Sequence, residues 1–367
     1  MASIFSKLFG SKKNTSVLGI DIGSSAIKVV QISLKKGRAV LDTYGALALG
    51  PYGGKEVGQS TNLETDKIVE ALGDILREAK VTSKKSGLAI PFRSSLMSMI
   101  EMPDVPDKEL AQMVPIEARK YIPVPIAEVS LDWSVIPRSN ETKEEDPKRK
   151  FPTKDVLVVA IHNDAIEKFQ NIVVQSELET KFFEIEIFST MRSVVSAQEK
   201  APVMIFDMGA TFTKLYIVER GLVKQSHTIN RGSQSITDAI AQSMQMSIED
   251  AERLKRNTGL GTTEEGKDIA SVVDLTLNYI FSEANRVLVN YQKKHNKAIQ
   301  KVVLVGGGSS LKGLIEYAEK SFGADVVLGN PFSKVEAPAF IEDVLRGAGP
   351  EFSVAMGIAL RRLQELE

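Results

Sequence analysis

The segments VLGIDIGSSAIKVVQI at residues 17–32 and VMIFDMGATFTKLYIV at residues 203–218 match each other without a gap. The match pairs an aspartate, a glycine and a lysine of one copy with the same residue types in the other: Asp21 with Asp207, Gly23 with Gly209, and Lys28 with Lys214. In each copy an apolar run enters a short polar turn and then resumes with β-forming residues, which predicts two strands joined by a tight hairpin. The repeat therefore predicts a protein of two related halves.

The residue types at both turns suit a polyphosphate ligand. Glycine lets the backbone approach a phosphate closely, and turn amides together with the hydroxyls of Ser24, Ser25 and Thr211 can donate hydrogen bonds to its oxygens. The carboxylates of Asp21 and Asp207 would repel a phosphate unless a hard cation, usually Mg²⁺ with its waters, lies between them. An ordinary β-turn produces a single D-x-G pattern as well. Two matching copies favour turns that face each other across a cleft and grip one nucleotide.

A third element, KVVLVGGGSSLKGL at residues 301–314, predicts a buried strand that ends in Gly306, Gly307 and Gly308 and leads through Ser309 into a helix. Backbone without side chains can pack there against a base or a ribose, and amides at the start of a helix can face a phosphate. Three glycines alone would be a weak signal. Together with the two matched hairpins they predict the nucleoside side of the same site.

Composition narrows the classes of function. At 367 residues, 43% of them hydrophobic and 25% charged, we expect two packed globular units. Because 46 Lys and Arg nearly cancel 47 Asp and Glu, charge predicts no nucleic acid partner. The chain has no cysteine, and His162, His227 and His295 lack metal-ligand spacing. No apolar run is long enough to span a bilayer and no signal peptide is recognisable, so we expect a cytoplasmic protein without a transmembrane segment.

Local sequence patterns elsewhere in the chain carry further predictions. Residues 1–13 place apolar side chains at helical spacing beside lysines, which fits either a foot that touches membrane or a frayed tail. Four further stretches carry predictions: extended chain at 88–102, a helix kinked at Pro115, a charged loop at 139–150, and a strand at 182–188.

The two hairpins and the glycine-ended strand, in this order and at these spacings, resemble the phosphate-1, phosphate-2 and adenosine motifs of the actin, sugar-kinase and heat-shock chaperone ATPase superfamily. The resemblance spans about residues 17–363 and implies an α/β, actin-like (ribonuclease-H-like) fold of two domains with ATP and Mg²⁺ between them. It places Asp21 and Asp207 in the magnesium shell. It assigns the remaining ligand contacts to Gly23, Ser24, Ser25, Lys28, Gly209, Thr211, Thr213 and Lys214 at the hairpins and to Gly306, Gly307, Gly308 and Ser309 at the third element.

Two charged pairs in the helices between these motifs also resemble superfamily positions. Glu252 with Lys255, and Glu249 nearby, look like the ribose-contacting residues, and Glu283 with Arg286 looks like the adenine-side pair. A solvated helix face carries the same i, i+3 spacing, so both interpretations of these pairs stay open.

Residues 114–136, VPIEARKYIPVPIAEVSLDWSVI, look like the E-x-x-(K/R)-Y-I-P-x-P-x-x-E-(V)-x-x-D stretch characteristic of PilM-like proteins. This resemblance implies a small inserted subdomain of the FtsA/PilM type. The expected organisation is a tail at 1–16, a first actin-like domain at 17–83 and 189–202 with the C-terminal helix 352–367, the inserted subdomain at 84–188, and a second actin-like domain at 203–351 with a helical adenosine-side part at 246–300.

In PilM-like proteins, a groove between the inserted subdomain and the first domain receives the cytoplasmic N-terminal peptide of PilN, a bitopic membrane protein. The resemblance thus implies an ATP-binding scaffold of the type IV pilus, or of a related secretion system, held at the inner membrane by its partners. Pilus motor ATPases and self-association are further contacts to test. An FtsA-like cell-division filament protein and a small-molecule kinase of the same fold are the alternatives, although no catalytic aspartate for a kinase can be located.

The sequence assigns no catalytic residue. Hydrolysis needs a group that positions and activates water near the γ-phosphate. Lys214, which follows the second turn, is cationic at neutral pH and suits contact with phosphate better than base catalysis. We therefore expect ATP binding with weak or no hydrolysis.

Overall fold

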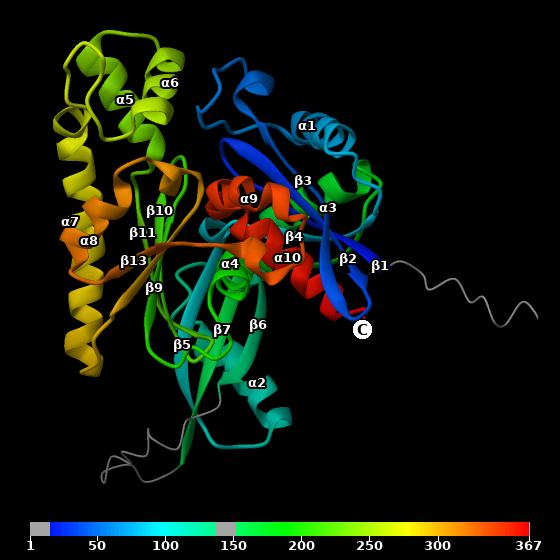
Figure 1. Ribbon diagram of the computed structural model, residues 1–367. Coiled ribbons are helices and arrows are strands. Elements are labelled where there is room, and N and C mark those ends of the chain that lie inside the picture. The colour runs from blue at the N-terminus through cyan, green and yellow to red at the C-terminus, as the bar shows by residue number, and fades with distance from the viewer. Residues whose placement is uncertain (1–14, 137–151, 367) are drawn as a thin grey trace, which may run out of the picture. The chain divides into compact units, whose positions relative to one another are not determined.

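The computed structural model describes residues 15–136 and 152–366 (Figure 1). The foot expected at 1–13 and the charged loop expected at 139–150 lie outside the described residues. Contacts divide the chain into a larger unit, made of the chain up to Ala89 and from Gln175 onward, and a smaller unit, Ile90–Val174. Among the described residues, no helix combines the length and the apolar character needed to cross a bilayer.

The larger unit contains two five-stranded sheets with equivalent strand orders. The first has the order β3-β2-β1-β4-β8 and consists of β1 (Thr15–Ile22), β2 (Ala26–Lys35), β3 (Arg38–Ala48), β4 (Lys85–Ile90) and β8 (Glu179–Ile185). The second has the order β11-β10-β9-β12-β13 and consists of β9 (Val203–Met208), β10 (Thr213–Glu219), β11 (Leu222–Ile229), β12 (Lys301–Val305) and β13 (Asp325–Leu328). In both sheets an antiparallel meander continues into a parallel neighbour.

The matched hairpins occupy the same place in both sheets. Strands β1 and β2 pair so that Asp21 stands opposite Lys28, and β9 and β10 pair so that Asp207 stands opposite Lys214. The prediction of two related α/β halves is confirmed, because the sequence repeat is also a repeat of strand pairing. Residues directly opposite in an antiparallel pair share a face of the sheet, so each aspartate has a lysine beside it.

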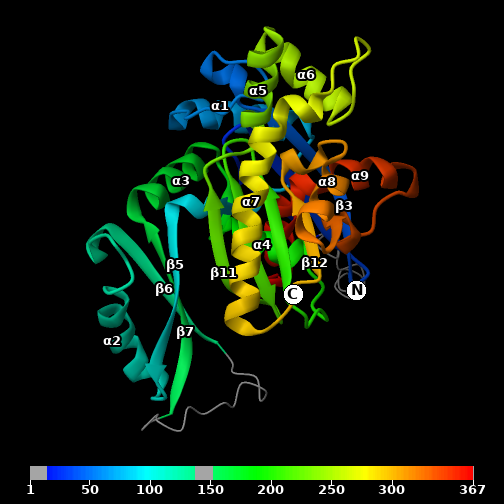
Figure 2. The same ribbon diagram turned by 90° about the vertical axis from the view of Figure 1, so that its left-hand side faces the viewer.

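Helices cover the sheets of the larger unit. Helix α1 (Thr65–Glu78) packs on β2 and β3, whereas α10 (Ser353–Gln364) packs on β1, β2 and α4 (Glu186–Val194). The second half carries α5 (Ser233–Met244), α6 (Ile248–Thr258), α7 (Ile269–His295) and α8 (Leu314–Phe322), and α9 (Glu342–Ala348) precedes α10. Figure 2 shows α7 running along the second sheet. The Phe281 ring of α7 stacks on Phe206 of β9 with centroids 5.1 Å apart, so the core of this half lies between α7 and the sheet.

The described part of the smaller unit contains an antiparallel sheet with the order β5-β7-β6 and the helices α2 and α3. Its elements are β5 (Ser95–Pro103), α2 (Asp107–Ala118), β6 (Val129–Ile136), β7 (Thr153–His162) and α3 (Asn163–Gln175), which ends at the boundary of the unit. Helix α2 continues through Pro115. Its Leu110 and Val114 are buried in one apolar cluster with Val156 and Val158 of β7, which gives this unit a core of its own.

Three boundaries differ from the sequence predictions. The insertion expected at 84–188 is wider than the smaller unit, because β4 and β8 at its two ends belong to the first sheet. The extended run expected at 88–102 is divided between β4 and β5, which lie in different sheets. The strand expected at 182–188 stops at Ile185, where α4 begins.

Strand β1, helix α10 and helix α4 approach each other backbone to backbone. A methyl group on Gly357 of α10 would lie 1.9 Å from the carbonyl oxygen of Ser189 in α4. A methyl group on Gly19 of β1 would likewise lie 1.9 Å from the carbonyl oxygen of Ala355 in α10. Glycine at both positions lets three elements pack without intervening side chains, which fixes α4 relative to the first sheet.

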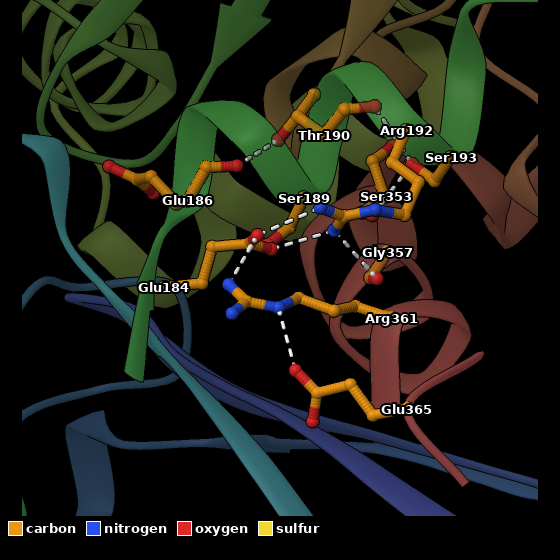
Figure 3. A network of polar contacts seen from close by, with 10 residues as sticks. All are labelled: Glu184, Glu186, Ser189, Thr190, Arg192, Ser193, Ser353, Gly357, Arg361 and Glu365. Carbon is orange, nitrogen blue, oxygen red and sulfur yellow. Dashed lines mark hydrogen bonds and ion pairs between the residues drawn. The ribbon is translucent and has the colours of Figure 1, made fainter. Parts of the chain in front are cut away.

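A buried ion network reinforces this packing (Figure 3). The Glu184 carboxylate accepts two hydrogen bonds from Arg192, at 2.7 and 2.8 Å, one from Arg361 at 2.8 Å and one from the Ser189 hydroxyl at 2.5 Å. Burial opposes ionisation of Glu184, but the guanidinium of Arg192 and these further donors lower its pKa. The carboxylate stays charged and links the end of β8 to α4 and α10.

The close approach of α4 and α10 predicts a steric cost at Gly357. We expect Gly357→Ala to destabilise the protein by about 3 kcal/mol, because an added methyl would overlap the Ser189 carbonyl and force the helices apart. Gly73→Ala in α1 is the matched control, since nothing lies within 4 Å of the added methyl there. This control should raise stability by up to about 1 kcal/mol through helix propensity. Urea unfolding measures both, and equal stability of the two variants would refute the described contact.

Candidate functional site

The turns of the two hairpins meet. In each turn the glycine N–H donates to a carbonyl oxygen three residues on, Gly23 to Ala26 and Gly209 to Phe212, both at 3.0 Å. The hydroxyl oxygens of Ser24 and Thr211 lie 3.0 Å apart. The two halves of the larger unit therefore bring their repeated turns face to face, with Ser25 in the first turn beside Ser24.

The aspartates beside these turns are buried and differ in how they are paired. Asp21 is 8% exposed and Asp207 is 5% exposed. The Lys28 ammonium is 3.8 Å from Asp21, whereas the Lys214 ammonium is 2.8 Å from Asp207. Burial raises the pKa of Asp21 to about 6, against the pull of Lys28 and with a further rise from the negative charge of Glu186. The surroundings of Asp21 therefore disfavour its ionised form.

Glu186 joins this cluster from a third element. It is the first residue of α4, and its carboxylate lies 2.7 Å from the Lys214 ammonium. Burial opposes the charge on Lys214, but the carboxylates of Asp207 and Glu186 raise the pKa of Lys214 well above its usual value. One ammonium therefore bridges two carboxylates. Sequence reasoning missed Glu186, because the alternation in FFEIEIF imitates a strand and hides the start of α4.

The glycines after β12 allow the third element to reach the second hairpin. A methyl group on Gly306 would lie 2.6 Å from the Asp207 carboxylate, and one on Gly308 would lie 2.6 Å from the Met208 side chain. Gly306 also has φ +83°, a conformation that favours glycine. Gly307 is exposed, and a methyl group added to it would meet only the Glu351 carboxylate within 4 Å, at 3.8 Å. The described surface beside the hairpins therefore includes open backbone at Gly307.

Two of the expected ligand hydroxyls have partners inside the protein. Thr213 is fully buried, and its hydroxyl donates to the Arg231 carbonyl at 2.8 Å. The Ser309 hydroxyl, also buried, donates to the Val305 carbonyl at 2.5 Å. Direct contact of these two side chains with a ligand stays a prediction. The Thr213 and Ser309 hydroxyls each fix the backbone of the loop beside them through these hydrogen bonds.

Glu252 and Lys255 form a buried cluster in the helices of the second half. Their charged groups are 2.6 Å apart, and the Thr237 hydroxyl donates to Glu252 at 2.7 Å and accepts from Lys255 at 2.8 Å. Arg256 also donates to Glu252, at 2.8 Å. Glu252 and Lys255 are each less than 10% exposed, so this pair does not lie on a solvated helix face. Glu249, in contrast, is exposed.

A segment of the first half, Gly58–Thr61, connects the first turn to this cluster. A methyl group on Gly58 would lie 2.8 Å from the Glu252 carboxyl carbon. The Ser60 N–H and hydroxyl both donate to the Gln234 side-chain oxygen, at 2.9 and 2.7 Å. The Thr61 N–H donates to the Ser24 carbonyl at 2.8 Å. This segment thus ties the two halves together beside the turns.

Glu283 and Arg286 lie elsewhere in the second half. They form an exposed i, i+3 pair on α7 at 2.5 Å, and Glu283 approaches His227 of β11 at 3.9 Å. Strand β11 is the edge of the second sheet away from β12, which carries the glycine turn. Strand β11 also pairs with β10 of the second hairpin, where His227 stands opposite Leu215. The assignment of the Glu283–Arg286 pair to adenine stays a prediction.

Comparison with known proteins places this geometry in a family. The Neisseria meningitidis serogroup B cell division protein FtsA is 23% identical over 376 aligned residues, which cover 92% of this chain and 88% of FtsA. A solved PilM–PilN type IV pilus biogenesis complex contains a chain of the same fold, with TM-score 0.80, 24% identity, and coverage of 95% of this chain and 99% of that chain.

The fold is shared more widely. The MreB 5 protein of Spiroplasma citri bound to AMPPNP matches with TM-score 0.51 and 12% identity over 96% of this chain and 98% of that chain. These neighbours confirm the expected actin-like α/β fold. The family model described as type IV pilus assembly protein PilM matches residues 19–363. Since that match covers nearly the whole sequence, this chain belongs to the PilM family of type IV pilus assembly proteins.

Proposed function

We propose that this protein is an ATP-binding scaffold of the inner-membrane assembly platform of a type IV pilus or related secretion system, and that it binds the cytoplasmic N-terminal peptide of a PilN-like membrane protein. The observation that carries the nucleotide part is the meeting of two repeated turns over buried aspartates. Family membership favours this role over an FtsA-like filament protein or a small-molecule kinase. Attachment to the membrane would come through the partner.

The residues at the turns fit a magnesium-bearing triphosphate. Their backbone amides and the hydroxyls of Ser24 and Thr211 suit phosphate oxygens, and the Lys28 ammonium adds positive charge. Asp21 and Asp207 supply the carboxylate oxygens that Mg²⁺ prefers, and Mg²⁺ commonly takes one or two carboxylates with waters and phosphates. In the described part of the chain no three or more His, Cys, Asp or Glu side chains form a metal-holding group. The donor set thus suits a metal that arrives with its nucleotide.

The opposite side of the ligand would rest on the glycine turn and the helical cluster. Open backbone at Gly307 suits contact with adenosine, and Glu252 with Lys255 suits contact with the ribose. The AMPPNP complex of a protein with this fold supports a nucleotide as the ligand class. Magnesium would supply charge neutralisation for the phosphates. The protein's own residues would bind, orient and partly enclose the nucleotide.

The peptide site is proposed for the smaller unit. In its described part, β5 and β6 are the edge strands of the sheet, and an extended peptide can add to a sheet edge through backbone hydrogen bonds. Ile116 and Tyr121 of this unit are exposed at 65% and 48%, which offers apolar contacts at and near the Tyr121-Ile122-Pro123 stretch. The PilM–PilN complex supports PilN as the class of partner.

Replacement of Asp21 by asparagine should change Mg-ATP affinity and the free energy of unfolding in opposite directions. We expect Asp21→Asn to weaken Mg-ATP binding at least tenfold while raising the free energy of unfolding of the nucleotide-free protein by about 1–3 kcal/mol at neutral pH. The folded-state pKa of about 6 lies above the ordinary 3.8, so wild-type stability should fall as pH rises from about 4 to 6. The asparagine variant should lack this fall. Calorimetric titration and urea unfolding across that pH range measure both effects.

Asp42→Asn provides the matched control for Asp21→Asn. Although burial opposes it, hydrogen bonds from Ser33, Lys35, Ser16 and Gln31 lower the pKa of Asp42, so this carboxylate stabilises the fold. Its replacement should destabilise the protein and leave ATP affinity unchanged. A loss of stability in both variants, with unchanged ATP affinity in both, would remove the nucleotide proposal.

Intrinsic ATP turnover should be slow. The Glu186 carboxylate is held by the Lys214 ammonium, which makes it a poor proton acceptor for an attacking water. We expect the purified protein to release phosphate from Mg-ATP at below about 10⁻³ per second, the range of unassisted nucleotide switches. A phosphate-release assay measures this rate. Turnover on the order of 1 per second, as in kinases, would contradict it.

Trp133 offers a direct test of the peptide site. It is the only tryptophan of the chain and lies on edge strand β6. A tryptophan-free peptide with the N-terminal sequence of the PilN-like partner should shift Trp133 emission with saturation, because a strand added at β6 changes its exposure. A peptide of the same composition in scrambled order should leave the emission unchanged. Binding of the native peptide without any change in emission would exclude the β6 edge.

A further inference from the structure

The two lysines of the repeat are not equivalent in the structure. Lys214 is 85% shielded from solvent at its side chain and contacts both Asp207 and Glu186, at 2.8 and 2.7 Å. The side chains of Asp207 and Glu186 are themselves 7% and 11% exposed. Lys28 makes one longer contact, 3.8 Å from Asp21. The same residue type, at matching positions, therefore contacts two carboxylates at one hairpin and a single, more distant carboxylate at the other.

Two buried carboxylates around one positive charge are the donor arrangement that a hard divalent cation takes in proteins. Here the positive charge is the ammonium group of Lys214, which is part of the chain itself. Lys214 sits on β10 directly opposite Asp207, so strand pairing holds its side chain at the cluster. An isolated buried carboxylate costs several kcal/mol, so removing the ammonium would leave two such groups in need of a cation.

We propose that Lys214 is a built-in counter-cation that takes the place of a divalent metal between Asp207 and Glu186 in the nucleotide-free protein. The pair is thereby closed to free divalent ions, and the fold is stable without them. The part of this inference that concerns bound nucleotide rests on the proposed function: the metal that accompanies ATP would first meet Asp21, whose lysine is farther away. The part that concerns the empty protein stands on the contacts of Lys214 alone.

The test uses Mn²⁺ as a probe for divalent binding without nucleotide. Free Mn²⁺ is counted by electron paramagnetic resonance in solutions of the full-length protein, and thermal unfolding is followed with and without 1 mM Mn²⁺. We expect the wild type to bind Mn²⁺ only in the millimolar range and Lys214→Met to bind it at least tenfold more tightly. Lys214→Met should also be destabilised in EDTA and regain a few degrees of melting temperature in Mn²⁺.

Two control variants isolate the cluster. Lys297→Met removes an ammonium that pairs with one buried carboxylate, Glu219, so it should lose stability without any response to Mn²⁺. The double variant Lys214→Met/Glu186→Gln keeps only Asp207 of the pair and should lose the gain in Mn²⁺ affinity. The proposal would be overturned if Lys297→Met responded to Mn²⁺ as strongly as Lys214→Met does. It would also be overturned if the double variant bound Mn²⁺ as tightly as Lys214→Met.

If Lys214→Met does not fold, the Mn²⁺ affinity of the wild type still tests whether the Asp207–Glu186 pair is closed to divalent ions. Mn²⁺ binding to the wild type below about 100 μM without nucleotide, abolished by Glu186→Gln, would refute a closed pair. Nucleotide affinity is measured separately by ATP titration in excess Mg²⁺. Failure of ATP to bind would defeat the proposed function but leave the gain of Mn²⁺ affinity in Lys214→Met intact, so the two failures are distinguishable.

Discussion

Two aspartates are buried where the turns of the two halves meet, and burial of a carboxylate is costly unless a positive charge lies close by. The strand register supplies that charge, because each hairpin places a lysine opposite its aspartate. The supply is uneven. Asp207 is tightly paired, whereas Asp21 keeps a raised pKa and an incomplete partner. A site that leaves one acid short of positive charge is suited to a ligand that brings its own cation.

The scaffold around this site is built from close backbone contacts. Gly19 and Gly357 let β1, α10 and α4 touch without side chains between them, and the Glu184 network holds the same elements by charge (Figure 3). Because Glu186 is the first residue of α4, the position of its carboxylate depends on that packing. Distant residues of the C-terminal helix thus determine the geometry of the charge cluster.

The sequence predicted those parts of the site that depend on local pattern. The gapless repeat was enough to predict both hairpins and the equivalence of Asp21 with Asp207, because strand pairing within a hairpin is set by neighbouring residues. It could not assign β4 and β8 to the first sheet, since that pairing joins segments separated by the whole smaller unit. Glu186 was hidden for a related reason: apolar and acidic residues alternate up to Phe188, and only tertiary packing shows that α4 begins at this glutamate.

Hairpins that share their aspartate, glycine and lysine positions therefore differ in electrostatics because their surroundings differ. A repeat of sequence alone would give Lys28 and Lys214 equal contacts, but α4 brings Glu186 to one of them only. The Lys214 ammonium lies between two carboxylates and is 2.8 Å from Asp207, whereas the Lys28 ammonium is 3.8 Å from Asp21. The Gly58–Thr61 segment then links the less compensated turn to the second half through Gln234 and Ser24. Ser24 belongs to the turn whose aspartate, Asp21, is the less well paired, and it also contacts Thr211 of the second half. A ligand that neutralises Asp21 would therefore bind beside a contact that joins the two halves.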